Sequence, residues 1–178
     1  MKKIIVIVFA VFASQSMIAQ AKVNPVIKSY GAVYSVPDNW EKADKDRDYK
    51  ILVDITDAAD KPDTINVYLE AVATLINLHA VAGVSAKNMH VVVVFHKMGT
   101  LSILNNEAYQ KRFKMDNPNL SMLTELHNAG VQFFVCGQNL YRGKLPETSI
   151  APEVKVAVSA LTTITTYQLR GYAMINFK

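Results

Sequence analysis

Cysteine is almost absent from this sequence, in which Cys136 is the only thiol among 178 residues. A single cysteine excludes an intrachain disulfide and the paired-cysteine motifs of zinc and redox sites. The chain also lacks a G-x-G-x-x-G segment after its first strand, a Walker phosphate loop and an H-x-x-x-H pair. These absences disfavour nucleotide binding of those types, and we expect neither a cofactor nor a bound metal.

The amino terminus has the three parts of a secretory signal peptide. Residues 1–3 are short and basic, residues 4–13 are apolar without interruption, and residues 19–21 are the Ala-Gln-Ala of a cleavage site. The apolar run is shorter than the ~20 residues needed to span a bilayer. We therefore predict a signal peptide over residues 1–21 and an exported mature chain, periplasmic or secreted, with no membrane span.

Charge is nearly balanced once the leader is removed. The 19 basic residues include Lys2 and Lys3, so the mature chain keeps 17 of them against 15 acidic residues, a formal charge of +2. This balance gives no electrostatic support for nucleic-acid binding. The remaining chain has the length of one domain. We assign residues 22–48 to an arm, which Tyr34 and Trp40 pack onto the domain or onto a neighbouring subunit, and residues 49–178 to the domain.

Two hydrophobic periods alternate within the domain. Apolar runs predict strands over residues 49–55, 88–96, 131–136, 154–159 and 172–177. Apolar residues at three- and four-residue steps predict helices over residues 63–81, 105–113, 119–128 and 161–169, and a short helix follows Cys136. Strands that are apolar throughout and alternate with helices form parallel sheets covered on both faces. The fold class is therefore α/β, a three-layer α/β/α sandwich with a mainly parallel five-stranded sheet.

Cys136 ends the third predicted strand, and the carboxyl ends of parallel strands are where such sheets bind ligands. Gly137 is expected to let the chain turn sharply there. The free amides at the start of the short helix, those of Gly137 and Gln138, stabilise a thiolate or another anion. The alternative is that Cys136 is a buried packing group, as most free cysteines are. The sequence leaves both interpretations open.

Other polar residues share this edge. His96 ends the second strand and is a candidate acid or base, or a partner for the thiolate. Ser159 and Thr162 are candidate anion ligands at a further helix start, although an N-cap with ordinary helix surface is the favoured explanation. The strand-ending residues expected to lie near one another are Asp54, Thr56, His96, Cys136 and Ser159, and positive charge is available from Lys97, Arg112 and Arg142.

Five segments resemble the DsrE/DsrF-like proteins, and more narrowly their exported single-domain members. They are residues 88–96 (NMHVVVVFH), 105–113 (NNEAYQKRF), 117–120 (NPNL), 129–138 (AGVQFFVCGQ) and 154–160 (VKVAVSA). The resemblance extends from about Gly31 to Phe177 and is specific as a combination. It implies a five-stranded parallel sheet between helices, and assembly into trimers or hexamers. Surplus apolar surface also points to a homo-oligomer.

In the sulfur-relay members of that family, a cysteine at the equivalent strand end accepts sulfur as a persulfide and passes it to a partner. Cys136 matches this cysteine. The chain departs from the pattern in being exported, and in having Lys97 directly after His96, where many relatives have glycine. We predict a sulfur-handling protein with Cys136 as persulfide acceptor, His96 as its acid or base, and a sulfur donor or acceptor protein as partner. Sulfurtransferase-like turnover stays open, and the alternative is a non-catalytic oligomeric binding protein for a small anionic or sulfur-containing ligand.

Overall fold

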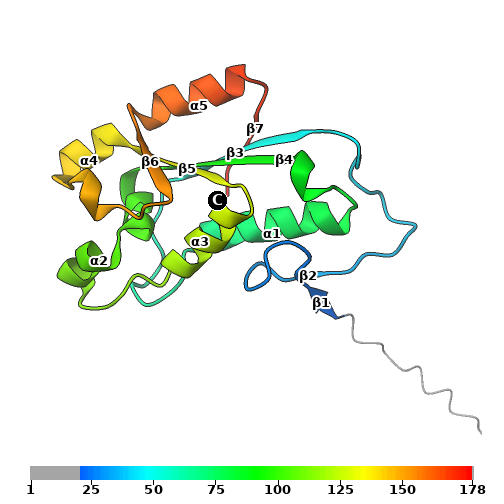
Figure 1. The fold of residues 1–178 in the computed structure, drawn as a ribbon, viewed down its shortest axis with the longest axis horizontal. Coiled ribbons are helices and arrows are strands. Elements are labelled where there is room, and N and C mark those ends of the chain that lie inside the picture. The colour runs from blue at the N-terminus through cyan, green and yellow to red at the C-terminus, as the bar shows by residue number, and fades with distance from the viewer. Residues whose placement is uncertain (1–20, 178) are drawn as a thin grey trace, which may run out of the picture.

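A five-stranded parallel sheet forms the centre of the computed structural model, which describes residues 21–177 (Figure 1). The predicted signal peptide lies outside the described residues, apart from Ala21. The strands are β1 (Lys22–Val23), β2 (Val33–Tyr34), β3 (Tyr49–Ile55), β4 (Met89–Phe95), β5 (Gln132–Cys136), β6 (Val154–Ala157) and β7 (Ala173–Ile175). The α-helices are α1 (Val67–Val81), α2 (Asn106–Phe113), α3 (Leu120–Asn128), α4 (Gly137–Gly143) and α5 (Ala160–Leu169), and three 3-10 segments cover Ala86–Asn88, Lys97–Ile103 and Glu147–Ser149.

The sheet has the strand order β6-β5-β4-β3-β7, and every neighbouring pair is parallel. The central strand β4 is buried throughout residues 91–95, as expected for an apolar strand with helices on both faces. The predicted fold class is confirmed. Because all five strands run the same way, their carboxyl ends share one edge, at the end of the molecule that carries α2 and α4 (Figure 1).

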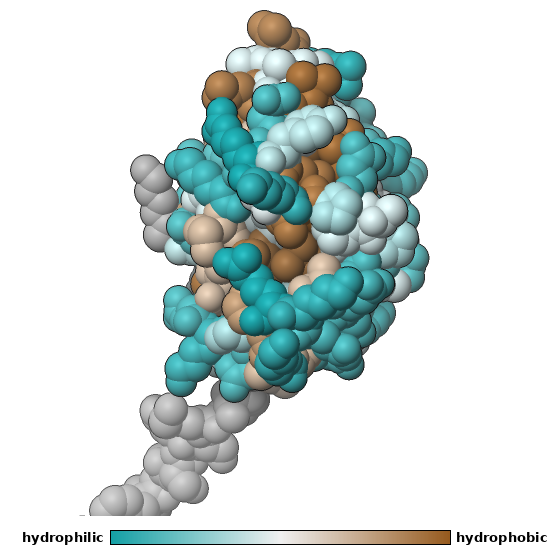
Figure 2. All heavy atoms as spheres, turned by 90° about the vertical axis from the view of Figure 1, so that its left-hand side faces the viewer, coloured by the Kyte–Doolittle hydropathy of each residue, from teal (hydrophilic) through white to brown (hydrophobic). Residues whose placement is uncertain are grey.

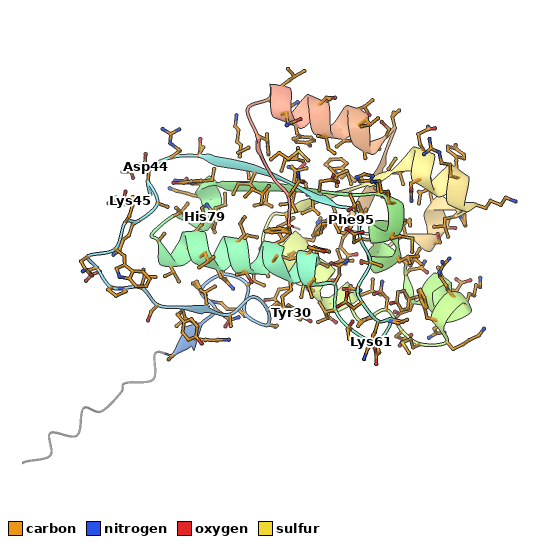
Figure 3. The ribbon with its side chains drawn as sticks, turned by 180° about the vertical axis from the view of Figure 1, so that it is seen from behind. Tyr30, Asp44, Lys45, Lys61, His79 and Phe95 are labelled. Atoms are coloured by element: carbon orange, nitrogen blue, oxygen red, sulfur yellow. The ribbon has the colours of Figure 1, made fainter. Side chains whose placement is uncertain are left out.

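The two faces of the sheet are covered unequally. Helices α1 and α3 lie on one face and enclose the larger core, where Phe95 packs against Phe133 with ring centroids 6.0 Å apart (Figures 1 and 3). Among the described helices, α5 alone covers the other face, above β3, β4 and β5. The cluster beneath it is small and consists of Leu52, Val92, Val94, Cys136 and Ala160. No helix within residues 21–177 has the length and apolar character needed to cross a membrane.

Side-chain caps explain why two elements are shorter than the sequence predicts. The helix predicted from residue 63 begins at Val67, because the side chain of Asn66 accepts hydrogen bonds from the amides of Tyr68 and Leu69. The strand predicted to reach residue 159 ends at Ala157, because Ser159 is already the N-cap of α5. The 3-10 segment Lys97–Ile103 was not predicted, since it has no apolar period of its own.

The arm is held against α1 by a buried amide rather than by aromatic residues. Tyr34 and Trp40 are 54% and 59% exposed, so they do not pack the arm onto the domain, and packing onto a neighbouring subunit stays a prediction. Ile27 of the arm is fully buried in the main core, and Figure 3 shows Tyr30 beside α1. Asn77 of α1 is fully buried, and its side chain bonds to the backbone of the arm. Its side-chain oxygen accepts from the amides of Val26 and Ile27, and its side-chain nitrogen donates to the carbonyls of Ile27, Tyr30 and Gly31.

Candidate functional site

The carboxyl ends of three neighbouring strands bring Asp54, His96 and Cys136 together. Phe95 of β4 pairs with Val135 of β5, so the next residues along the two strands, His96 and Cys136, lie side by side. The backbone of His96 stays extended, with φ −151° and ψ 179°, and so continues the line of β4. Asp54 belongs to β3, the strand on the other side of β4. His96 therefore lies between the other two residues.

The three side chains also share a face of the sheet. Successive side chains of a strand point to opposite faces, so residues two apart point the same way. Leu52, Val94 and Cys136 belong to the buried cluster beneath α5. Asp54 lies two residues after Leu52, and His96 lies two residues after Val94, which places both on the α5 face with Cys136. The strand-ending residues predicted to lie near one another do so in these three cases.

Asp54 and His96 form a close, largely buried pair. The distance from Asp54 Oδ1 to His96 Nε2 is 2.8 Å, and the two side chains are only 13% and 20% exposed. Neither atom makes a well-aligned hydrogen bond within the described part of the chain, so the pair is a short contact without linear geometry. A carboxylate oxygen only accepts, so the contact is attractive when Nε2 carries the proton. In the neutral imidazole, Nδ1 is then the free acceptor.

Cys136 is buried, with 8% of the residue exposed, between the sheet and the first residue of α5. Gly137 follows it directly in α4, and Cys136 is the N-cap residue of that helix. The predicted reason for Gly137 is wrong, since its φ is not positive and no sharp turn depends on it. A Cβ at Gly137 would instead lie 2.7 Å from the carbonyl oxygen of Ala157. The glycine therefore allows β6 to approach the start of α4.

A hollow of about 450 Å³ lies beside Cys136, between α4 and the end of β6. Gly137 and Gln138, two of the predicted ligand-binding residues, are part of its wall. Ser159 and Thr162, the other two, do not line it. The hydroxyl of Ser159 accepts from the amide of Thr162 at 3.0 Å, and the hydroxyl of Thr162 donates back to the Ser159 carbonyl at 3.0 Å. Both have the structural cap role, and a ligand role for them stays a prediction.

Four buried amide and hydroxyl side chains near this edge were not predicted. They are Asn66, Ser102, Asn117 and Asn119, and they fix the segments that follow β3 and β4. The side-chain amide of Asn66 donates to Ser102 Oγ and to the carbonyl of Asp57, both at 2.8 Å. The backbone amide of Asn66 donates to Asn119 Oδ1. These bonds join residues 9, 36 and 53 positions apart, so no local pattern indicates them.

Asn139 of α4 likewise fixes the segment that follows β4, beside His96. Its side chain accepts from the amide of Lys97 and donates to the Lys97 carbonyl, both at 3.1 Å, and to Thr100 Oγ1 at 2.9 Å. The segment after β4 is thereby fastened to the helix that Cys136 begins. Within residues 21–177, no three His, Cys, Asp or Glu side chains are grouped as the ligands of a metal ion would be.

A comparison with known protein families gives a match that covers the residues of the candidate site. The sequence profile of the DsrE/DsrF-like family matches residues 53–177, a segment that contains Asp54, His96 and Cys136. The chain belongs to the DsrE/DsrF-like family. Membership supports a protein of the sulfur-relay type, as the resemblance in the sequence implied. No curated protein matches the chain.

Two solved structures share the DsrE-like fold. The protein of unknown function MTH1491 from Methanobacterium thermoautotrophicum is 21% identical, with a TM-score of 0.57, over 73% of this chain and 100% of its own. The ychN protein from E. coli is 16% identical, with a TM-score of 0.54, over 72% of this chain and 99% of its own. At these identities the likeness concerns the fold alone.

Proposed function

We propose that this DsrE/DsrF-like protein is a sulfur carrier in which Cys136 accepts a sulfane sulfur as a persulfide. The observation that carries the proposal is the row of Asp54, His96 and Cys136 on one face of three adjacent strands, with Asp54 2.8 Å from His96. A carboxylate that orients an imidazole beside a thiol is the arrangement that activates a sulfur nucleophile. Family membership adds chemistry of the sulfur-relay type.

The loading step needs a thiolate and a donor with a sulfane sulfur. His96 takes the proton of the Cys136 thiol, and the thiolate attacks the outer sulfur of a donor such as thiosulfate. The donor's S–S bond breaks, and sulfite leaves with the electron pair of that bond. Cys136 then carries one additional sulfur as a persulfide, and no external oxidant is consumed. In the unloading step an acceptor thiolate attacks the outer sulfur, and the Cys136 thiolate is released.

Burial favours the alternative function, a binding protein without sulfur transfer. Cys136 is not part of the wall of the hollow beside Gly137 and Gln138, and only 8% of it is exposed. In such a protein the hollow beside Gly137 and Gln138 would bind a small ligand, and the thiol would only pack. The two functions differ in what they require of Cys136, because a carrier thiol has to react and a packing thiol has to fill space.

Thiol reactivity distinguishes the two functions. In a carrier, Cys136 reacts with iodoacetamide near neutral pH faster than free N-acetylcysteine. In a packing role, alkylation is slower than that of the free thiol. In either case Cys136→Ser is expected to lower the free energy of unfolding by about 1–3 kcal/mol, because the hydroxyl enters the apolar cluster beneath α5. We expect fast alkylation, and slow alkylation would refute the carrier.

We also propose that the protein acts outside the cytoplasm, because its first 21 residues have the order of a secretory leader. A sulfur carrier in that compartment would exchange sulfur with donors and acceptors found there. Amino-terminal sequencing of exported protein should find a start between Gln20 and Lys22. Recovery of chains that still begin with Met1 would contradict export with cleavage.

Assembly with further copies of the chain is the remaining part of the proposal. Large apolar side chains are exposed around the edge strand β6: Tyr141 is 81% exposed, Val158 75% and Leu161 77%. Figure 2 shows apolar surface running as a band across the end of the molecule that carries α4 and β6. An unpaired edge strand flanked by exposed apolar side chains is usually covered by another chain. We take the occupant to be a second copy, in a trimer or hexamer.

Charge placed within this surface should separate the copies. The double variant Val158→Glu, Leu161→Glu is expected to run as a monomer in light scattering at micromolar concentration, while the parent protein runs as a trimer or hexamer. The matched control is Val67→Glu, at an exposed position at the start of α1, on the other face of the sheet. It should assemble like the parent. A parent protein that is monomeric would contradict the proposed assembly.

A further inference from the structure

A second hollow, of about 320 Å³, lies where the segment after β4 meets α2 and α4. Three cationic side chains are part of its wall: Lys97 after β4, Arg112 on α2 and Arg142 on α4. Thr100 and Asn139 are also part of the wall, and their side chains bond to each other. Helices α2 and α4 lie at the same end of the molecule, so the hollow belongs to the edge of the sheet that carries the site (Figure 1).

The three cations have no acidic partner. No Asp or Glu lines this hollow, and within residues 21–177 neither Lys97, Arg112 nor Arg142 has a carboxylate within ion-pair distance. Lys111, the neighbour of Arg112, does have an acidic partner, because its ammonium is 2.6 Å from the Glu107 carboxylate. The hydrogen bond from Lys111, and then its charge, lower the pKa of that carboxyl. Among the described residues, the positive charge of the hollow is thus uncompensated.

The backbone of Lys97 supports a role for its side chain. Lys97 has φ 50°, in the left-handed region that lysine seldom adopts and glycine adopts freely. Asn139 holds it there by bonding both its amide and its carbonyl. A glycine at this position would remove the strain and would also remove the cation from the wall of the hollow.

From these contacts we infer that the hollow is a binding site for a small oxyanion with two or more negative charges. The inference rests on the proposed function in one respect, since it identifies this anion as the sulfane-sulfur donor and thiosulfate as a representative. Lys97 directly follows His96 and Asn139 lies three residues after Cys136, so the hollow adjoins the strand ends that carry the site, and neither His96 nor Cys136 is part of its wall. Three convergent cations suit a doubly charged oxyanion better than a monoanion such as acetate.

Calorimetric titration at low ionic strength, with thiosulfate and with sulfate, tests the site. The parent protein should bind both anions, because they share shape and charge, and should bind acetate far more weakly. The double variant Arg112→Gln, Arg142→Gln should lose roughly tenfold or more in affinity. Lys97→Gly should also weaken binding, with a melting temperature at or above that of the parent. Lys87→Gln, at an exposed lysine before the amino end of β4, should bind like the parent.

Two outcomes would overturn the inference: no heat of binding with either dianion, or equal affinities in the parent and in the two charge variants. The Cys136→Ser variant separates this inference from the sulfur-carrier proposal, since it should bind thiosulfate as the parent does. If thiosulfate binds and no sulfur reaches Cys136, the carrier function fails and the anion site stands. If Cys136 is loaded equally fast in the parent and in the charge variants, the anion in this hollow is not the sulfur donor and the carrier function stands.

Discussion

Replacing Gly99 with alanine is expected to lower the free energy of unfolding by about 3 kcal/mol or more. An added Cβ would lie 2.2 Å from the carbonyl oxygen of Ile55 and 2.9 Å from its carbonyl carbon. Both atoms are backbone at the end of β3, so relief requires the strand or the segment after β4 to move. The amide of Gly99 also donates to the carbonyls of Thr56 at 2.8 Å and His96 at 3.0 Å. The displacement would therefore reach His96.

Urea unfolding of Gly99→Ala beside Gly143→Ala measures this effect. Gly143 lies in α4, and a Cβ there would meet only Leu145 side-chain atoms at 3.6 Å, an ordinary contact. Alanine in a helix loses less backbone entropy on folding than glycine, so Gly143→Ala should be neutral or slightly stabilising. If the two variants unfolded at the same urea concentration, the close approach of Gly99 to β3 would be refuted.

Replacing Asp54 with asparagine is expected to slow alkylation of Cys136 roughly tenfold near pH 7, a change of about 1.4 kcal/mol in the activation free energy. The carboxylate holds His96 through a 2.8 Å contact, and an amide removes the charge while keeping the size. Loss of that charge disfavours the protonated imidazole beside the sulfur, and so disfavours the thiolate. Removing a negative charge also helps the thiolate directly, but Asp54 lies two strands from Cys136 and this opposing effect is weaker.

Rescue by a conservative variant shows whether the Asp54 carboxylate acts on the thiol. Asp54→Glu returns the carboxylate and should restore most of the alkylation rate near pH 7 that Asp54→Asn loses. Asp48→Asn is the matched control, because Asp48 lies 3.7 Å from His90 in an exposed pair at the other end of the strands. That variant should react at the parent rate. An unchanged rate in Asp54→Asn would contradict a role for the pair in thiol activation.

Apolar pattern was sufficient to predict the sheet. The strand predicted over residues 49–55 is β3 to the residue, and the run of four valines before Phe95 is the buried centre of β4. Both follow from local sequence, because a strand buried on both faces has to be apolar at every position. Parallel direction then placed the strand-ending residues at one edge, which is why Cys136 and His96 could be paired in advance.

Contacts that depend on register or on distant side chains could not be predicted in this way. The short contact of Asp54 with His96 requires the seven-residue register of β3 on β4. Asn77 holds an arm about fifty residues away, and nothing in an otherwise apolar helix indicates the partner of one amide. Gly137 was assigned to a turn, whereas the reason for it is the carbonyl of Ala157 on a neighbouring strand. Packing of this kind exists only once the sheet has formed.

Intact mass spectrometry after exposure to a sulfane-sulfur donor tests the sulfur-carrier function most directly. Purified mature protein is incubated with thiosulfate or polysulfide, freed of small molecules and weighed, with Cys136→Ser treated in parallel. A carrier gains the mass of one sulfur atom, loses it again on treatment with dithiothreitol, and shows neither change in Cys136→Ser. A parent protein whose mass stays unchanged with both donors, under conditions where a reference sulfurtransferase is loaded, would contradict sulfur transfer through Cys136.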